Sequence, residues 1–342
     1  MFLNIVAVVM AFAVVTATPA EAAPRLVPAS DREVVFTVDG TTTYGTLHVP
    51  EHRPGQRLRA ALLLPGSGPT DRDGNQPPAL SPNTLALVAE ALGDKQVATL
   101  RFDKYGTGRT GLGAYEGRPE ELDYPAFVRQ ATAAYETLRD QPETDRRALM
   151  VVGHSEGAMT ALQLGGTVSP RPVGLALLQP QAIRLLDLVT LQLKEQIAEA
   201  TRQGHLTPEE QRTIDAAIDA AVAALRDDRP VDTTELPAPI AQLFEAFQGT
   251  NHRFVTSSDA IYPPDTAAAL RPGTRVLLTC GTNDPQVPCD TTDALTTALR
   301  RAHVGMPGRV TLHGVDHLLH DENHPDTLAP AVLSALHRFA KR

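Results

Sequence analysis

Short apolar runs alternate with amphipathic stretches along the chain after residue 25. Two runs, 33–38 and 43–49, flank Asp39-Gly40, a dipeptide typical of tight hairpin turns, and predict an antiparallel pair of strands. Continuously apolar runs predict strands that are buried on both faces of a parallel sheet. These runs occupy residues 59–65, 96–102, 148–152, 173–179 and 275–280, and a last strand is expected at 309–313.

Helices are predicted between these strands. Ser81-Pro82 is expected to supply an N-cap and a first-turn proline for a helix that ends near Leu92. Asp123 is expected to cap a second helix that runs to about Arg139, and a closing helix is predicted over 327–340. Strands that alternate with helices form right-handed βαβ units, so the predicted fold class is α/β, a mostly parallel central sheet flanked by helices.

One long stretch, residues 181–264, contains no convincing strand. A broad amphipathic helix is predicted over 183–203, and Gly204 stops it. Thr207-Pro208-Glu209-Glu210 has the pattern of a capping box with proline at the first helical position, and a third helix is predicted within 235–247. We expect a helical cap inserted over the carboxyl edge of the sheet. A separately folding domain is the alternative, disfavoured because the stretch is short and amphipathic.

The first 22 residues have the pattern of a secretory signal peptide. The apolar run 5–15 is too short to span a bilayer, and Ala20-Glu21-Ala22 places small residues where a signal peptidase cleaves, after Ala22. The pattern departs from the usual one because the first basic residue is Arg25. A buried N-terminal helix or strand is the alternative. We expect a secreted or periplasmic protein, and the predicted divisions are a signal peptide at 1–22, a core at 23–180 and 265–342, and the cap at 181–264.

The composition restricts the classes of binding partner but says little about any reaction that the protein catalyses. The 342 residues carry a net charge of -9 and contain no long run of Lys or Arg, which argues against nucleic acid or an anionic membrane surface as the main partner. The two cysteines, Cys280 and Cys289, either close a short loop in an oxidising compartment or remain free thiols. Two cysteines without a paired CxxC motif do not predict a thiolate metal site.

A serine between two glycines follows one of the buried strands. Gly153-His154-Ser155-Glu156-Gly157 lies directly after 148–152 and directly before a helical stretch. This GxSxG context is typical of a nucleophile on a strained strand-to-helix turn, where the helix N-terminus adds a partial positive charge. An ordinary tight turn is the alternative. Ser155 is therefore the candidate nucleophile.

A serine nucleophile needs a base and an orienting carboxylate. Asp284 comes soon after the strand 275–280, where its side chain would reach the carboxyl edge of the sheet. Three other aspartates are weaker candidates: Asp290 is expected to cap a helix, Asp259 lies near the cap, and Asp316 is too close to the candidate base to orient it.

The base is expected after the last strand. His317 follows Gly314, where a loop can return the imidazole to the serine. His313 is still within the strand, and His320 and His324 are expected on the solvated surface. A metal site is the alternative, but its residues lack the HExxH order. That set consists of His317, His320, Asp321 and His324.

The order Ser155…Asp284…His317 resembles that of the α/β-hydrolase superfamily over residues 30–342. The resemblance is closest to capped bacterial carboxylesterases related to serine aminopeptidase-like hydrolases. "LLLPGSGPTDRDGN" (62–75) is similar to the oxyanion loop of that group, and "LRFDKYGTGRTG" (100–111) is similar to its R-x-D-x-x-G-x-G turn. The resemblance implies an oxyanion hole formed by the backbone N–H groups of Ser67 and Glu156, with Gly68 as the alternative to Ser67.

Within the same turn, Arg101, Asp103 and Arg109 are interpreted as a salt-bridged structural element rather than as substrate ligands.

The resemblance implies a serine carboxylesterase that uses an acyl-enzyme mechanism on a small-molecule ester and needs no metal or organic cofactor. Together with the predicted signal peptide, it leads us to expect a secreted enzyme. An aminopeptidase or acyl-peptide hydrolase on the same scaffold is one alternative, and a non-catalytic binding protein is another. Leucines at 185–193 are expected either to wall an acyl pocket or to pack the cap against the core. Because Trp is absent and Phe and Tyr are few, an aromatic-rich pocket is not expected.

Overall fold

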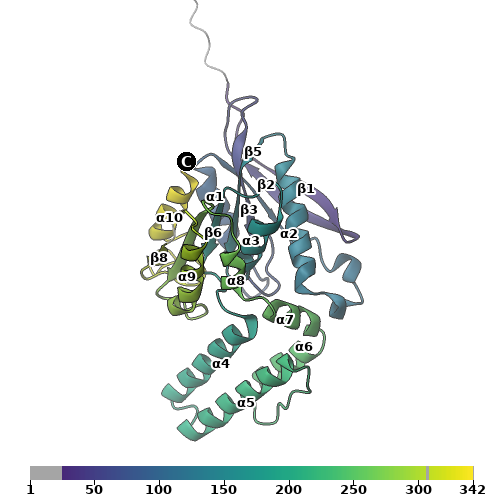
Figure 1. The fold of residues 1–342 in the computed structure, drawn as a ribbon, viewed down its shortest axis with the longest axis vertical. Coiled ribbons are helices and arrows are strands. Elements are labelled where there is room, and N and C mark those ends of the chain that lie inside the picture. The colour runs from purple at the N-terminus through teal and green to yellow at the C-terminus, as the bar shows by residue number, and fades with distance from the viewer. Residues whose placement is uncertain (1–24, 306–307, 342) are drawn as a thin grey trace, which may run out of the picture.

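A computed structural model describes residues 25–305 and 308–341, and its strands form one eight-stranded sheet in the order β1-β2-β4-β3-β5-β6-β7-β8 (Figure 1). The β1–β2 and β2–β4 pairs are antiparallel and the others are parallel, which confirms the predicted, mostly parallel α/β fold. The strands are β1 (Ser30–Val38), β2 (Thr41–Val49), β3 (Leu58–Leu64), β4 (Val97–Phe102), β5 (Thr144–His154), β6 (Gly174–Leu178), β7 (Arg275–Gly281) and β8 (Arg309–Leu312).

Helices cover both faces of this sheet, so the core has three layers. One face carries α2 (Tyr124–Arg139), α3 (Glu156–Thr167), α8 (Pro263–Ala268) and α9 (Asp293–Arg301). The other face carries α1 (Thr84–Gly93) and α10 (Pro330–Ala340). Short 3₁₀ helices lie at η1 (Gly113–Tyr115), η2 (Pro119–Glu121) and η3 (Cys289–Thr292). Each face has its own buried apolar cluster, as expected for a sheet whose strands are apolar on both sides.

Two local signals produce the structures that they predict. Asp39 and Gly40 both have positive φ, 48° and 74°, as a two-residue hairpin turn requires. The Asp123 carboxylate accepts a hydrogen bond from the Ala126 N–H at 2.9 Å and so caps α2.

The predicted start of the first helix is wrong. Helix α1 begins at Thr84 rather than at Pro82, and Asn83 precedes it in the left-handed conformation without a side-chain cap. The Leu85 N–H instead donates to the backbone carbonyl of Asp73 at 3.0 Å. A neighbouring loop therefore satisfies the first turn, and this contact between distant residues overrides the local Ser-Pro signal.

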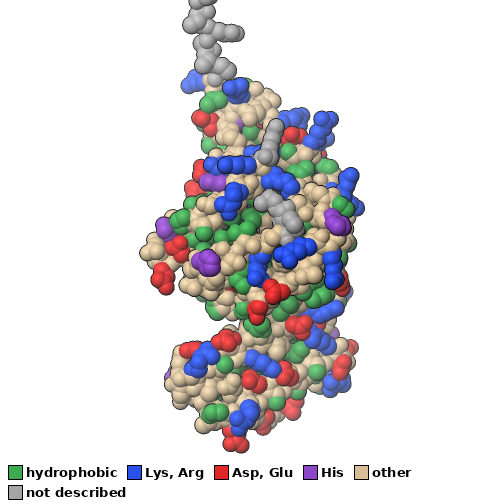
Figure 2. Space-filling view, turned by 60° about the vertical axis from the view of Figure 1, so that its left-hand side comes forward, with side chains coloured by type: hydrophobic (Ala, Val, Ile, Leu, Met, Phe, Trp, Pro, Cys, Tyr) green, Lys and Arg blue, Asp and Glu red, His purple; other side chains and the backbone are tan. Residues whose placement is uncertain are grey.

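Five helices lie between β6 and β7, where the cap was predicted. They are α4 (Leu185–Arg202), α5 (Pro208–Arg226), α6 (Ala238–Gln248), α7 (His252–Asp259) and α8. Gly204 follows α4 with φ 76°, and Thr207 and Glu210 form the predicted capping box at the start of α5. Helices α4, α5 and α6 form a lobe that projects from one end of the sheet (Figure 1). In Figure 2 this lower lobe is set off from the body by a constriction and carries interspersed acidic and basic side chains.

The inserted helices bury an apolar cluster of their own, although the short, amphipathic stretch was not expected to form one. It includes Leu193, Ile197, Ile218, Val222 and Phe244. The periodic apolar faces of α4, α5 and α6 thus pack mainly against one another.

The predicted signal peptide, residues 1–22, lies outside the described residues. Within residues 25–305 and 308–341, no helix is long and apolar enough to cross a membrane.

Candidate active site

A strand-to-helix turn at the carboxyl edge of the sheet holds Ser155. Strand β5 ends at His154 and α3 begins at Glu156, which leaves Ser155 between them with φ 55° and ψ −120°. A non-glycine residue at positive φ is strained, and such strain is common at nucleophile elbows. A Cβ atom on Gly153 would overlap the backbone of Gly157, and a Cβ atom on Gly157 would overlap the Leu64 carbonyl. Both glycines are therefore required by close backbone approach.

The loop after β7 brings Asp284 to His317. The Asp284 Oδ2 atom accepts a hydrogen bond from His317 Nδ1 at 2.8 Å, and the aspartate side chain is completely buried. The other carboxylate oxygen accepts the Gln286 and Val287 N–H groups at 2.9 Å each. Since the ionised carboxylate only accepts hydrogen bonds, Nδ1 carries the proton and Nε2 is left as the basic nitrogen of the imidazole.

A second histidine, His154, contacts both the backbone and the ring of His317. Its Nε2 donates to the His317 backbone carbonyl at 2.7 Å, and the two rings lie 4.8 Å apart. Burial, together with the neighbouring His317, lowers the pKa of His154 to about 3, so this ring is neutral. Sequence reasoning missed this residue, because it occupies an unspecified position of the GxSxG motif and its partner is 163 residues away.

The other aspartates considered for the acid have different surroundings. Asp290 is exposed on η3, and Asp316 accepts the Leu318 and His320 N–H groups of its own loop. Asp259 is buried at the joint between α4, α5 and α7, where it accepts hydrogen bonds from Arg226 and from the Leu186 N–H. Of the four aspartates, Asp284 is the one paired with His317.

The surface prediction for the later histidines is wrong in one case. His320 is buried, whereas His324 is more exposed and pairs with Asp321 at 2.7 Å. In the tight loop after β8, the Asp316 N–H donates to the His320 carbonyl, and the His320 N–H donates to the Asp316 carboxylate. This loop turns His320 inward. Among the described residues, no three or more His, Cys, Asp or Glu side chains are grouped so that they could hold a metal ion.

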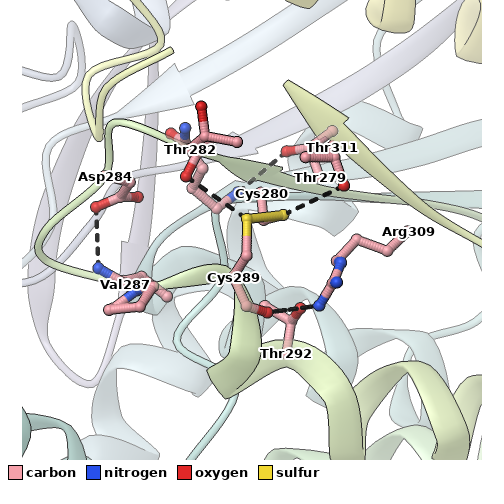
Figure 3. The surroundings of a disulfide bond; sticks show 12 residues. Thr279, Cys280, Thr282, Asp284, Val287, Cys289, Thr292, Arg309 and Thr311 are labelled. Carbon is pink, nitrogen blue, oxygen red and sulfur yellow. Dashed lines mark hydrogen bonds between the residues drawn. A yellow bond between two sulfur atoms is a disulfide. The ribbon is translucent and has the colours of Figure 1, made fainter. Parts of the chain in front are cut away.

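Cys280 and Cys289 form a disulfide, which settles the alternative left open by the sequence. Figure 3 shows that it joins the end of β7 to the start of η3, with Asp284 on the loop between the two cysteines. Arg309 on β8 donates to the Cys289 carbonyl at 2.6 Å and so fixes the far end of the same loop. The covalent bond and the arginine together restrict the position of Asp284.

The loop after β3 lies against Ser155. A Cβ atom on Gly66 would lie 3.2 Å from the Ser155 Cβ atom, so the loop backbone approaches the serine closely. The Ser67 carbonyl accepts hydrogen bonds from Thr70 Oγ1 at 2.7 Å and Gln76 Nε2 at 3.1 Å. Ser67, Gly68 and Glu156 line one cavity together with Ser155, but the described contacts do not select Ser67 over Gly68.

The charged turn after β4 has the structural role that was expected. Asp103 accepts two hydrogen bonds from the Arg72 guanidinium, at 2.6 and 3.0 Å, and one from the Arg109 N–H at 2.9 Å. Arg101 pairs with Asp73, and Arg109 pairs with Glu33. The three predicted residues of this turn do not line the cavities at Ser155. Through Arg72 and Asp73, these contacts hold the loop after β3 against the turn.

Two cavities meet at Ser155. The larger, about 470 Å³, lies between the core and the inserted helices, and Leu185 and Leu188 are among its walls. The smaller, about 160 Å³, is lined by His317, His154 and Ser67 as well as by Ser155. His317 and Ser155 therefore share a cavity.

The larger cavity differs from expectation in its aromatic wall, formed by Tyr105, Phe127, Phe247 and Phe254. The Phe127 ring lies 5.3 Å from Phe254 and 5.7 Å from Tyr105, both edge to face. Few aromatic residues exist in the chain, but tertiary packing collects several of them at this one site.

Solved structures share the fold at low sequence identity. An esterase from Pyrococcus furiosus superposes with a TM-score of 0.57 at 14% identity and covers 92% of each chain. Est1E from Butyrivibrio proteoclasticus, solved with ferulic acid bound, has a TM-score of 0.51 at 18% identity and covers 90% of this chain and 97% of its own. Dipeptidyl peptidase 4 from Porphyromonas gingivalis has a TM-score of 0.55 at 14% identity over 92% of this chain and 35% of its own.

The sequence itself carries the family assignment. None of the curated proteins compared with the chain matches it. The model of the alpha/beta hydrolase family matches residues 61–331, a range that includes the Ser155 elbow, the Asp284 loop and His317. The chain belongs to the alpha/beta hydrolase family.

Proposed function

We propose that this hydrolase is a serine carboxylesterase in which Ser155 is the nucleophile, His317 the general base and Asp284 the residue that orients it. The observation that carries the proposal is the 2.8 Å hydrogen bond between His317 Nδ1 and the fully buried Asp284, beside a strained serine that shares a cavity with His317. This combination of a nucleophile, a base and an oriented tautomer is what acyl transfer to serine requires.

In the first half-reaction, Ser155 Oγ attacks the ester carbonyl while His317 Nε2 takes the hydroxyl proton. The tetrahedral intermediate then expels the alcohol, which receives that proton from His317, and an acyl-serine ester remains. In the second half-reaction, water attacks the acyl-enzyme with His317 again as the base, and the carboxylic acid leaves. Asp284 remains ionised throughout and stabilises the imidazolium.

The proposed oxyanion hole consists of the backbone N–H groups of Ser67 and Glu156. Glu156 is the first residue of α3, so its N–H is free of the helical hydrogen-bond ladder and lies at the positive end of the helix. Both residues line the larger cavity beside Ser155. Such donors are each worth about 3 kcal/mol of transition-state stabilisation in comparable sites.

The two cavities suggest how an ester would lie. His317 must protonate the leaving alcohol, and His317 lines the smaller cavity. The alcohol part of the ester is therefore expected to bind in the smaller cavity. The larger cavity, with its aliphatic and aromatic walls, then receives the acyl group. The expected substrates are esters of an apolar acid with a small alcohol.

Ester hydrolysis is favoured over aminopeptidase activity by the charges in the larger cavity. An aminopeptidase would need a free acidic group to receive the substrate ammonium, but the cavity-lining carboxylate of Glu156 already lies 3.7 Å from the ammonium of Lys104. Esterases occur among the structural neighbours, one of them with an aromatic acid bound, and peptidases occur there as well.

We also propose that the protein is exported. The predicted signal peptide motivates this proposal, and the Cys280–Cys289 disulfide supports it, because disulfides persist mainly in oxidising compartments. Detection of a mature N-terminus at Ala23 in the culture medium or periplasm would test it, and retention of full-length chain in the cytosol would contradict it.

The test of the esterase proposal compares the wild-type protein with Ser155→Ala. We expect the wild type to hydrolyse p-nitrophenyl esters and to be labelled by a fluorophosphonate at Ser155. The variant should lose at least about 10⁴-fold in kcat and all labelling, with an unchanged Tm. A panel of acyl chain lengths and alcohols, with aminoacyl anilides alongside, identifies the substrate class. Full activity in Ser155→Ala would contradict the proposal.

A further inference from the structure

Lys104 is a buried cation beside the candidate oxyanion hole. It lies on the turn after β4, and its Nζ donates a hydrogen bond to the Gly66 carbonyl at 2.6 Å. The same nitrogen lies 3.7 Å from Glu156 Oε1 and 5.9 Å from the centre of the Phe127 ring. Lys104 thus reaches from one loop to the two backbone segments that hold Ser67 and Glu156.

The contact with Gly66 fixes the direction of one particular peptide group. The Gly66 carbonyl and the Ser67 N–H belong to the same planar trans peptide, so the two groups point in opposite directions. An ammonium on the carbonyl side therefore prevents this peptide from rotating, and it keeps the N–H turned away from Lys104. Because Gly66 has no side chain, its backbone would otherwise rotate more easily than that of other residues.

Lys104 and Glu156 form a buried ion pair in which each charge partly offsets the burial of the other. Burial lowers the pKa of Lys104, and the nearby Glu156 carboxylate opposes that shift. The other Glu156 oxygen has no hydrogen-bond partner among the described residues, so Lys104 is the main compensation for this buried carboxylate. A hydrogen bond from an ammonium to a carbonyl is also stronger than one between neutral groups.

We propose that Lys104 is a positioning residue of the oxyanion hole, which holds the Gly66–Ser67 peptide so that the Ser67 N–H faces the oxyanion formed at Ser155. The inference rests on the proposed serine esterase activity and deepens it. It also selects Ser67, rather than Gly68, as the donor from this loop. A purely structural role, in which Lys104 only neutralises Glu156, predicts a loss of stability without a specific effect on the transition state.

The experiment removes the lysine without leaving its carboxylate unpaired. Lys104→Met/Glu156→Gln is compared with Glu156→Gln alone, so that the difference reports the lysine. A second pair, Lys194→Met/Asp219→Asn, removes an exposed ion pair of the inserted helices and controls for the loss of a lysine and an acid. Three quantities are measured on each protein: kcat and KM for a p-nitrophenyl ester, the Ki of a trifluoromethyl ketone that forms an oxyanion adduct with serine, and Tm.

We expect kcat of the double variant to be about 10- to 100-fold lower than that of Glu156→Gln. This loss is smaller than the loss caused by deleting an oxyanion donor, because the Ser67 N–H is still present but is no longer held in position. KM should change less than about twofold, because the ground-state ester makes little use of this N–H. The Ki of the ketone should rise by the same factor as kcat falls. An unchanged kcat and Ki would overturn the inference, and so would a loss of Tm without the parallel change in Ki.

Two provisions keep the result interpretable. If the double variant does not fold, Lys104→Arg is measured in the same way. The planar guanidinium does not place a donor at the same point as the lysine ammonium, so we again expect kcat to fall and Ki to rise by the same factor. Wild-type values of kcat and Ki would overturn the inference. Fluorophosphonate labelling of the wild type at Ser155 is checked first. Its absence would overturn the proposed function as a whole, whereas labelling with unaffected Lys104 variants would overturn the role of Lys104 alone.

Discussion

The carboxyl edge of the sheet and the inserted helices are built on different principles. At the edge, Ser155, Asp284 and His317 are buried, and each lies within a few residues of a strand end. The inserted helices carry exposed ion pairs such as Lys194–Asp219, which contribute little to stability, and an apolar cluster of their own. The edge thus holds the candidate catalytic side chains in one geometry, while the inserted helices provide apolar side chains that line the larger cavity and can be exchanged for others. We infer that reaction type is a property of the edge and that substrate preference is a property of the insertion.

The largest expected effect comes from the edge. Asp284→Asn should lower kcat by about 10⁴-fold, the loss typical of an orienting aspartate in a Ser-His-Asp triad. The amide can turn its NH₂ group toward His317, which places the imidazole proton on Nε2 and removes the basic nitrogen. Ester turnover is the measurement. Asp290→Asn, an exposed carboxylate six residues later, should keep wild-type activity; an equal loss in both variants would mean that the loop as a whole, and not the Asp284 carboxylate, is sensitive.

An intermediate effect is expected in the pH dependence of stability. Because the pKa of His154 is lowered to about 3 in the native state, the unfolded chain binds a proton between that value and about 6.5 that the native state does not bind. Stability is therefore lost as the pH falls through this range, and His154 should account for about 2 kcal/mol of the loss between pH 7 and pH 5.

His154→Gln should lack this part of the acid loss, as urea unfolding at the two pH values would measure. His303→Gln, on an exposed loop, controls for the removal of a histidine. Equal acid losses in His154→Gln and the wild type would show that His154 is not held neutral in the native state.

The smallest effect is expected from the insertion. Leu188→Ala shortens a wall of the larger cavity and should raise KM for an octanoyl ester by about 5- to 10-fold, which corresponds to about 1 to 1.4 kcal/mol of lost apolar contact. An acetyl ester should be nearly unaffected, because its acyl group does not reach the wall. Leu191→Ala, on the same helix but outside this cavity, is the matched control. If both esters lost activity equally, the insertion would be part of the chemical machinery and the comparison would fail.

The sequence predicts those features that depend on neighbours in the chain. The Asp39-Gly40 turn, the Asp123 cap and the Thr207 capping box each need residues within three positions, and each forms as predicted. The predicted start of α1 is wrong because a first-turn N–H, that of Leu85, donates to the Asp73 carbonyl of another loop. The aromatic wall of the larger cavity and the apolar cluster of the insertion arise from tertiary packing, which no local pattern encodes.

The same division applies to the site. Ser155 is marked by its flanking glycines, and Asp284 and His317 are marked by their places after strands, so each can be nominated from the chain alone. Their hydrogen bond is a property of the folded molecule. His154 and Lys104 carry no such mark, because their partners are backbone carbonyls 163 and 38 residues away. Supporting residues of this kind require a structure.

The two glycines of the elbow have a consequence for how the protein can be altered. Their backbones touch each other and the end of β3, so that even a methyl group has no room at either position. In a library that randomises the whole site, active clones will keep Gly153 and Gly157, whereas variety will accumulate at cavity positions such as Val189 and Phe247 on the inserted helices. Directed evolution of new specificity is best begun there.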